Sequence, residues 1–257
     1  MSNLEAVARA AVLSGGAELR RRFRAGDTDA DFGQFDVKAA ADTAAEDYMV
    51  SVIRRAFPEH EIWAEERGKL PGESRVRWIV DPLDGTNNFA AGLPTFTTAI
   101  AVLRDEKPEL AVVYHPVSDD LYVARASDGI RYGGVPVRAE RAMALEATTV
   151  ATIAGREVAS RPELRTQYTT MVQSIDNRVK RVCDSWAPTV HASLFARGRM
   201  QGVIEFHPDI EEEAIVHLFA GEAGAVTRRD GPLFVAAPDE AMLEVLWDGV
   251  TAVREQS

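Results

Sequence analysis

The sequence predicts a mixed fold of helices and strands built in two halves, and three patterns carry this prediction. Before residue 60, two stretches place apolar residues at helical spacing. Between residues 96 and 124, short apolar runs separated by turns are typical of an antiparallel meander. After residue 148, apolar runs alternate with helical patterns, which is typical of an α/β unit. We therefore expect a larger half over residues 1–140 and an α/β half over residues 141–257.

The first half is predicted to begin with two helices that cover a sheet. Leu4, Val7, Ala8 and Leu19 lie at helical spacing, and the stretch ends in a basic turn that we interpret as a solvated helix end. The predicted elements are a helix at 3–25, a loop at 26–33, a helix at 42–57, strands at 61–64, 78–80, 96–103, 110–114 and 121–124, and turns at 129–136.

The second half is predicted to alternate strands and helices. A glycine follows the helical pattern at Gly198 and again at Gly224, where it ends a helix favourably. The predicted elements are strands at 148–153, 179–182 and 200–206, and helices at 162–175, 187–197, 210–223 and 238–253.

Composition restricts the kind of protein. The chain has 257 residues, of which 46% are hydrophobic and 27% charged, as in a globular protein with a substantial core. It contains no apolar run of membrane-spanning length and no apolar signal-peptide core, so we expect no membrane partner. The single cysteine, Cys183, excludes an internal disulfide and fits a cytoplasmic location. A net charge of -11 argues against nucleic acid as the main partner.

The stretch from Trp78 to Phe89 carries the chemistry. An apolar run reads as a buried strand that ends at Asp81, because Pro82 cannot continue the hydrogen-bond ladder. Asp81 and Asp84 are therefore expected to project into one small volume. Two close carboxylates resist ionising together unless a cation is bound. Hard oxygen ligands favour Mg²⁺ or Mn²⁺, and the Leu83 carbonyl could add a further oxygen.

The residues that follow could bind an anion. Gly85 permits a tight turn whose exposed amides, together with the Thr86 hydroxyl, can face a phosphate. Metal ligands followed directly by an anion cradle indicate a phosphate ester held on metal. A calcium-binding EF-hand loop fits less well, because Gly92 stands where the bidentate glutamate is needed.

The segment Asp81-Pro82-Leu83-Asp84-Gly85-Thr86-Asn87-Asn88-Phe89 resembles the D-P-[IL]-D-G-T-x-N-F signature of the inositol monophosphatase family. This family belongs to the metal-dependent, lithium-sensitive sugar phosphatases. The resemblance implies a layered αβαβα fold with the active site between the two halves. It also implies that the protein is often a homodimer.

The same resemblance extends toward the N-terminus. Asp42 matches an acid in a V-T-x-x-D segment that helps to hold the metal-bound water, although Ala39 replaces the threonine. The residues alone equally describe a helix cap, and the two roles are compatible. Glu65, in Ala64-Glu65-Glu66, matches the first glutamate of a G-E-E segment, which is a metal ligand and water activator.

Two further segments set the register of the second half. Residues 196–199 resemble A-x-G-R and residues 222–225 resemble E-A-G-G, which places Glu212 where the family has a metal-binding Asp in W-D. Asp209, one turn earlier, could replace it, and a solvated helix start is the remaining interpretation. The register also places Glu205 at a sugar-hydroxyl contact, and Trp186 where the family has a small residue.

We therefore predict a Mg²⁺-dependent phosphomonoesterase acting on a small sugar or polyol phosphate. The resemblance implies two or three Mg²⁺ ions (Mn²⁺ could substitute), held by Glu65, Asp81, the Leu83 carbonyl, Asp84 and Glu212. It assigns catalysis to Glu65, Thr86 and Asp42, and substrate binding to Asp84, Gly85, Thr86, Glu205 and Trp186. Two alternatives remain open. One is a related phosphatase for fructose 1,6-bisphosphate or a nucleotide 3′-phosphate. The other is a non-catalytic protein that binds a sugar phosphate or a partner protein.

Overall fold

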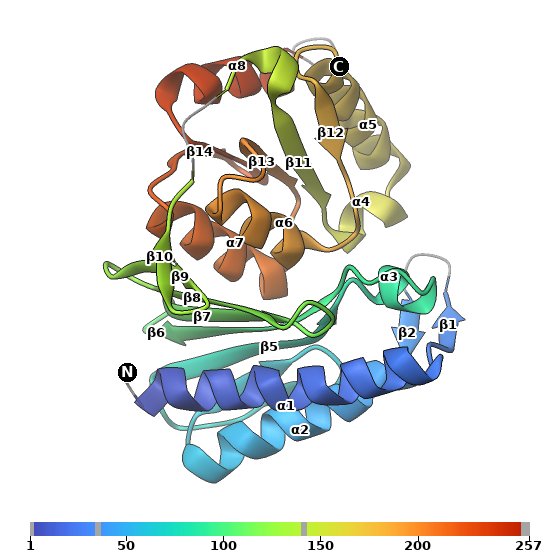
Figure 1. Ribbon diagram of the computed structural model, residues 1–257, viewed down its shortest axis with the longest axis vertical. Coiled ribbons are helices and arrows are strands. Elements are labelled where there is room, and N and C mark those ends of the chain that lie inside the picture. Colours follow the sequence, from blue (N-terminus) through green and yellow to red (C-terminus); the bar gives the residue numbers. More distant parts are fainter. Residues whose placement is uncertain (1–2, 34–36, 140–142, 253–257) are drawn as a thin grey trace.

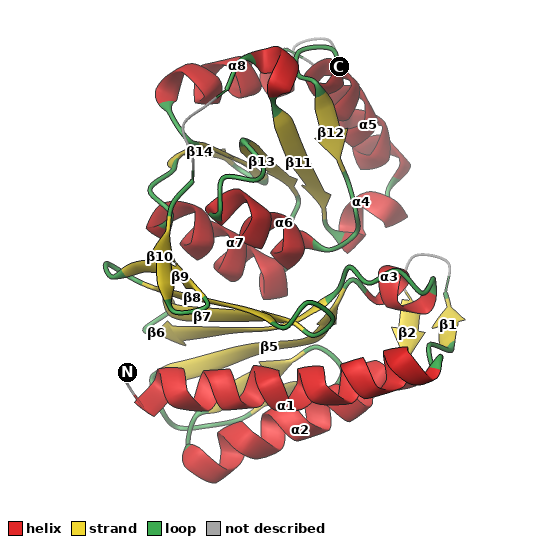
Figure 2. Cartoon of the chain, in the orientation of Figure 1, coloured by secondary structure: helices red, strands yellow, loops and turns green. Residues whose placement is uncertain are grey.

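The computed structural model describes residues 3–33, 37–139 and 143–252, which fold into five layers (Figure 1, Figure 2). Helices α1 (Asn3–Ala25) and α2 (Ala40–Ala56) cover the outer face of an eight-stranded sheet. Helices α6 (Pro188–Ala196) and α7 (Ile210–Glu222) lie between that sheet and a five-stranded sheet. Helices α5 (Pro162–Asp176) and α8 (Glu240–Thr251) cover the far face. The expected layered αβαβα fold is confirmed.

The eight-stranded sheet is built from the first half of the chain. Its strand order is β10-β9-β8-β7-β6-β5-β3-β4, antiparallel throughout except for the parallel pair β3 and β5. The strands are β3 (Glu61–Ala64), β4 (Gly68–Leu70), β5 (Val76–Asp84), β6 (Thr97–Arg104), β7 (Lys107–His115), β8 (Asp120–Arg125), β9 (Gly129–Tyr132) and β10 (Val135–Val137). Both faces are buried: Trp78 and Val80 pack with α1 and α2, whereas Ile79 packs with α6 and α7.

The five-stranded sheet comes from the second half, with strand order β12-β11-β13-β15-β14. Strand β11 runs parallel to β12 and β13, and the remaining pairs are antiparallel. The strands are β11 (Thr149–Ala154), β12 (Arg181–Cys183), β13 (Gly202–Phe206), β14 (Val226–Asp230) and β15 (Leu233–Ala237). Each sheet thus falls within one predicted half, while the expectation that the halves are separate domains stays a prediction.

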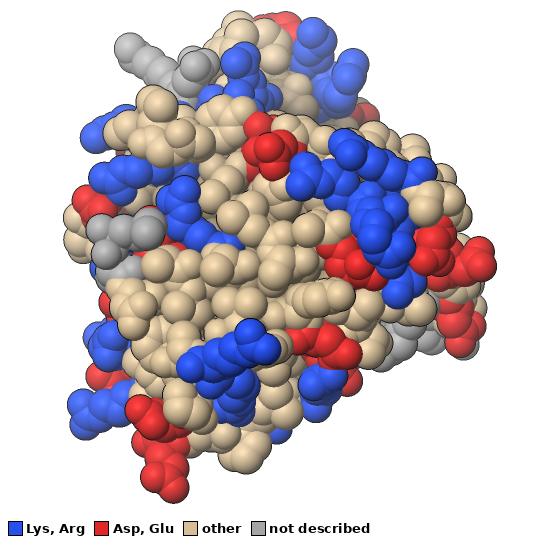
Figure 3. Space-filling model, turned by 60° about the horizontal axis from the view of Figure 1, so that its bottom comes forward, with Lys and Arg blue, Asp and Glu red and all other residues tan. Residues whose placement is uncertain are grey.

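Helix α1 packs closely because small residues face the sheet. A Cβ at Gly16 would lie 2.5 Å from the Tyr114 ring, so only glycine permits this approach. Near the C-terminal end of α1, Arg21 and Arg22 pair with Glu18. These pairs support the interpretation of the basic turn as a solvated helix end. Acidic and basic side chains are interspersed over the face seen in Figure 3.

Several predicted boundaries were wrong. Strand β5 does not end at Asp81 but continues to Asp84. The predicted loop at 26–33 contains β1 (Ala30–Phe32), which pairs with β2 (Val37–Ala39), and the predicted turns at 129–136 contain β9 and β10. Strands β4, β14 and β15 and the short helices α3 (Thr86–Ala90), α4 (Arg156–Ser160) and η1 (Leu145–Ala147) were not predicted. The predicted last helix forms as α8, but its predicted end, Val253, lies outside the described residues.

Among the described residues, no helix combines the length and the apolar character needed to cross a bilayer.

Candidate active site

A cavity of about 570 Å³ lies where the two halves meet, and most of the predicted site residues line it. The first half contributes Glu65, Asp81, Leu83, Asp84, Gly85 and Thr86. The second half contributes Arg156, Arg165, Tyr168, Asp184, Trp186, Asp209 and Glu212.

A bulge in β5 places two carboxylates at the cavity. Asp81 pairs with Ala99 on β6 and Asp84 pairs with Thr97, and the register shifts between them. Pro82 lies within the shift, where its missing N–H cannot serve a regular ladder. Both carboxylates are almost inaccessible to solvent, at 3% exposed for Asp81 and 4% for Asp84.

The turn after β5 requires glycine. Gly85 has a φ of +93°, and a Cβ on it would lie 2.9 Å from the Thr95 carbonyl oxygen. Helix α3 begins at the next residue, Thr86. The Thr86 hydroxyl donates to the Leu83 carbonyl at 3.0 Å, so this carbonyl already has one hydrogen-bond partner.

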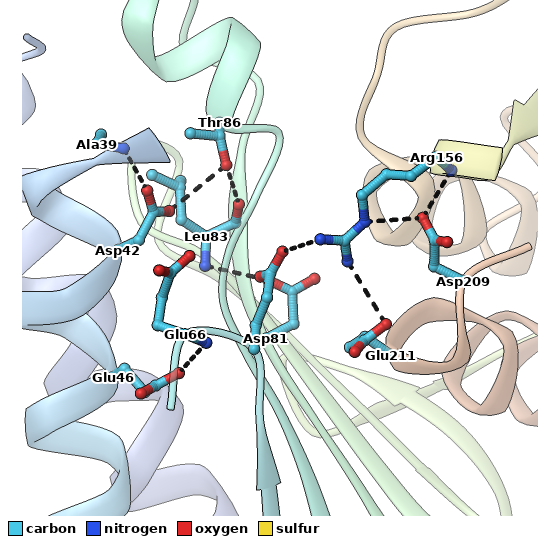
Figure 4. Close-up of polar contacts among 11 residues, drawn as sticks. Ala39, Asp42, Glu46, Glu66, Asp81, Leu83, Thr86, Arg156, Asp209 and Glu211 are labelled. Atoms are coloured by element: carbon cyan, nitrogen blue, oxygen red, sulfur yellow. Dashed lines mark hydrogen bonds and ion pairs between the residues drawn. The ribbon is translucent and has the colours of Figure 1, made fainter. Parts of the chain in front are cut away.

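Asp42 joins the same group from α2. Its Oδ1 lies 3.4 Å from the Thr86 hydroxyl, and its Oδ2 accepts from the Ala39 amide at 2.6 Å (Figure 4). The helix therefore starts two residues earlier than predicted, with Ala39 at the N-cap and Asp42 at position N3 of a capping box. Because one oxygen caps the helix and the other faces Thr86, the cap and the site role can coexist.

Asp84 is held by the second half of the molecule. Its Oδ2 accepts from the Thr189 amide at 2.8 Å and from the Thr189 hydroxyl, at the start of α6. The Asn88 side chain adds a second link, donating to the Ser185 carbonyl at 2.6 Å and to the Thr95 carbonyl at 2.8 Å. These bonds fix the motif of the first half against the loop that carries Trp186.

The buried acids hold their protons unusually strongly. Burial raises the pKa of Glu65 to about 8, although the Arg156 charge acts in the opposite direction. Burial also raises the pKa of Asp84 to about 6 despite the hydrogen bonds from Thr189. Burial and then the charges of Glu65 and Asp84 raise the pKa of Asp81 well above its ordinary value.

Glu212 behaves as a member of the same group. Loss of hydration, and then the charge of Asp84, raises the pKa of Glu212 well above its ordinary value. Glu212 is in turn one of the charges that raise the pKa of Asp81. The structure thus places Glu212 close to the two aspartates, at the position that the family register assigned to a metal ligand.

Arg156 brings a positive charge to the cavity. Its guanidinium lies 3.2 Å from Glu65. It also lies 3.2 Å from Asp209 and 3.6 Å from Glu211 (Figure 4). In the described part of the chain, no Lys or Arg forms an ion pair with Asp81, Asp84 or Glu212.

These donors fit a hard divalent cation by their chemistry. Asp81, Asp84 and Glu212 supply carboxylate oxygens, the ligands that hard divalent cations prefer. Charging the buried Asp81 and Asp84 is costly unless a cation neutralises them. The side chains do not form a closed cage as they stand: within residues 3–33, 37–139 and 143–252, no three His, Cys, Asp or Glu groups lie close enough to hold one ion.

Comparison with known proteins places the chain in a family. The model of the inositol monophosphatase family matches residues 1–219. The chain belongs to the inositol monophosphatase family. It is 34% identical over 199 residues to the protein named Nus factor SuhB of Escherichia coli, covering 76% of this chain and 72% of that protein. The Nus factor SuhB of Vibrio cholerae is 33% identical over 199 residues, covering the same shares.

Solved structures of this family have the same fold. The extragenic suppressor protein SuhB from Bartonella henselae aligns with a TM-score of 0.87 at 24% identity, covering 97% of this chain and 98% of that one. The inositol monophosphatase from Anabaena aligns with a TM-score of 0.80 at 24% identity, covering 99% and 97%.

Two residues assigned from the family pattern sit in contrasting places. Glu205 does not line the cavity in the described structure; it is fully buried, with Oε2 at 2.8 Å from His217 Nε2. Trp186 lines the cavity and is 64% exposed, with a φ of +52° that is unusual for a bulky side chain. Their roles in substrate binding stay predictions.

The sequence reasoning missed two residues that the structure brings to this site. Thr189 meets Asp84 across 105 positions of sequence, and no local pattern indicates such a contact. Arg156 lies two residues after the end of β11, at the first position of α4. A charged residue at the end of an apolar strand is the signal that could have identified it, as it did for Asp81.

Proposed function

We propose that this protein is a Mg²⁺-dependent phosphomonoesterase that hydrolyses a small sugar or polyol phosphate. One observation carries the proposal. Leu83, Thr86 and the buried pair Asp81 and Asp84 line one cavity. Asp42, which comes from α2, reaches this group through the Thr86 hydroxyl at 3.4 Å.

Different residues of the cavity would hold the metal ions and orient the attacking water. Bound Mg²⁺ would polarise the phosphate and lower the pKa of an attacking water. Asp81, Asp84, Glu212 and the Leu83 carbonyl would hold the ions. The Thr86 hydroxyl, already fixed by Leu83 and facing Asp42, would orient the water, and a carboxylate would accept its proton.

The substrate is proposed from the cavity wall. A volume of about 570 Å³ accommodates a small phosphate ester, and Trp186 offers an apolar surface for one face of a sugar ring. Fructose 1,6-bisphosphate and nucleotide 3′-phosphates remain the alternatives within the same chemistry. The predicted homodimer and cytoplasmic location likewise stay predictions.

Phosphate release from a panel of inositol, sugar and nucleotide phosphates, with and without Mg²⁺, tests the proposal. We expect Mg²⁺-dependent release, and we expect Asp84→Asn to lower kcat/KM by about 100-fold or more, because it removes a charged ligand of the ions that would polarise the phosphate. Asp128→Asn is the matched control, since Asp128 pairs with Arg131 on the surface. Full Mg²⁺-dependent activity in Asp84→Asn would refute the assigned role.

Thr86 offers a finer test of water orientation. Thr86→Val keeps the shape but removes the hydroxyl that donates to Leu83, so we expect kcat to fall by about 10- to 100-fold. Thr86→Ser retains the hydroxyl and should stay within a few-fold of the unchanged protein. Equal losses in both variants would show that packing, not the hydroxyl, matters.

A second candidate is a regulatory role without turnover, favoured by the relatives named Nus factor. For the same reason, the prediction that nucleic acid is not a main partner stays untested. Ala39, which stands in place of the family threonine, also motivates this candidate. Mn²⁺ binding without release of phosphate from any compound of the panel would favour it.

A further inference from the structure

The side chain of Arg156 lies among three carboxylates drawn from both halves of the molecule. Its Nη1 lies 3.2 Å from Glu65 Oε1, at the end of β3. Its Nε lies 3.2 Å from Asp209 Oδ2 and its Nη2 lies 3.6 Å from Glu211 Oε2, both at the start of α7 (Figure 4). One guanidinium therefore bridges the two halves at the cavity.

The main chain of Arg156 is fixed, so that only its side chain can adjust. Its amide donates to Asp209 Oδ2 at 3.0 Å. The preceding residue packs directly on the segment before α7, because a Cβ at Gly155 would lie 2.0 Å from the His207 carbonyl oxygen. The Arg156 backbone thus belongs to the α7 side of the cavity, and its guanidinium reaches across to Glu65.

Arg156 divides the acids of the cavity into two groups. Glu65, Asp209 and Glu211 share its positive charge. The other group, Asp81, Asp84 and Glu212, has no Lys or Arg ion pair within the described residues, although the Arg156 charge also reaches Glu212 and opposes the rise of its pKa. Divalent ions would therefore be favoured at the second group, whereas the first group already holds a cation.

A guanidinium is an effective substitute for an ion because it stays charged at every working pH. It also lies against Glu65 Oε1, an oxygen that a divalent ion would need. Two cations a few ångströms apart repel each other, and water screens only part of this repulsion because the Arg156 side chain is 42% exposed and the Glu65 side chain 21%. An ion that binds at Glu65 must therefore displace the Arg156 side chain.

We propose that Arg156 takes the place of one divalent ion beside Glu65, acting as a positioning residue that holds Glu65 to the start of α7. This inference rests on the metal site of the proposed function. Fewer ions then bind tightly than the full set of carboxylates would allow. Removing the guanidinium should open the Glu65 side of the cavity to an additional ion.

Counting bound Mn²⁺ tests this inference without relying on catalysis. Calorimetry and the electron paramagnetic resonance signal of free Mn²⁺ give the number of ions per chain and their affinities. We expect Arg156→Met, which keeps the length and removes the charge, to bind one more Mn²⁺ per chain or to bind the weakest ion at least tenfold more tightly.

Arg165→Met is the matched control for the loss of one positive charge. Arg165 lines the same cavity, but its side chain is exposed and forms no ion pair with these acids in the part of the chain described. If both variants bind Mn²⁺ in the same number and with the same affinities, Arg156 has no special place beside Glu65 and the inference is overturned.

A measurement on the unchanged protein covers the case in which Arg156→Met fails to fold. The ¹⁵N-labelled Nε–H signal of Arg156, assigned with Arg156→Lys, should stay near its metal-free position while the tightly bound Mg²⁺ saturates, because the guanidinium keeps its place beside Glu65. A shift of this signal to the position of a free arginine side chain as the first Mg²⁺ binds would overturn the inference alone. If the unchanged protein and Arg156→Met both fail to bind Mn²⁺, the metal requirement of the proposed function fails as well.

Discussion

The buried carboxyl of Asp84 should make the metal-free protein less stable as the pH rises, and Asp84→Asn should remove that effect. Burial raises the pKa of this group from 3.8 to about 6. The folded chain therefore holds the proton over a pH range in which the unfolded chain has already released it. A group with a raised folded pKa favours folding at low pH, and this advantage is lost as the pH rises through the folded value.

The size of the effect follows from the two pKa values. At pH 8 the carboxylate is ionised in both states, and the difference between the pKa values corresponds to about 3 kcal/mol of destabilisation. At pH 5 the folded group is mostly protonated, and the same linkage gives about 1.6 kcal/mol. The stability of Asp84→Asn relative to the unchanged protein should therefore increase by about 1.4 kcal/mol between pH 5 and pH 8.

Urea unfolding in EDTA at pH 5 and pH 8 measures this difference, since the amide cannot ionise while its oxygen can still accept from Thr189. The comparison of variant and unchanged protein cancels every other group that titrates independently. Relief of the repulsion on Asp81 should add to the gain. If Asp84→Asn is destabilised equally at both pH values, Asp84 is not a strained carboxylate, and the electrostatic reason for a cation at this position is lost.

Adding Mg²⁺ and two single substitutions give three further predictions. Adding Mg²⁺ at pH 8 should raise the midpoint of thermal unfolding, because each tenfold rise in Mg²⁺ concentration above Kd adds about 1.4 kcal/mol to the free energy of unfolding. An unchanged midpoint would contradict binding to the folded state. Gly85→Ala should destabilise by about 1–3 kcal/mol in urea, because of its positive φ and the Thr95 carbonyl at 2.9 Å, and by more than Gly92→Ala, whose Cβ would meet nothing within 4 Å. Trp186→Ala should leave stability within about 0.5 kcal/mol, since the side chain is 64% exposed, but raise KM for the preferred phosphate ester; an unchanged KM would remove Trp186 from substrate binding.

Long elements with regular apolar spacing could be predicted from the sequence. Helix α1 forms over the predicted residues because its buried positions repeat at helical spacing. Strand β14, by contrast, reads Val226-Thr-Arg-Arg-Asp230 and has no apolar pattern. It is an edge strand, and its pairing with β15 supplies what its own sequence does not indicate. Pairing of this kind becomes visible only in three dimensions.

In the candidate site, too, some residues could be predicted from the sequence and some contacts could not. Asp81 and Asp84 could be predicted because they lie in one continuous segment, and Glu212 could be placed by the family register. Arg156 meets Glu65 across 91 positions of sequence, so no spacing rule could have indicated the contact.

The bulge in β5 determines how the site would respond to the insertion or deletion of a residue. Side chains alternate along a regular strand, so two residues an odd number of positions apart point to opposite faces. Asp81 and Asp84 are three apart, yet they lie opposite Ala99 and Thr97, which are two apart and share a face. The extra residue therefore corrects the parity of the strand. Deleting a single residue between the two aspartates would remove the bulge, place them two apart and leave both carboxylates on one face. Keeping every residue in a regular ladder would instead send one carboxylate to the far side of the sheet.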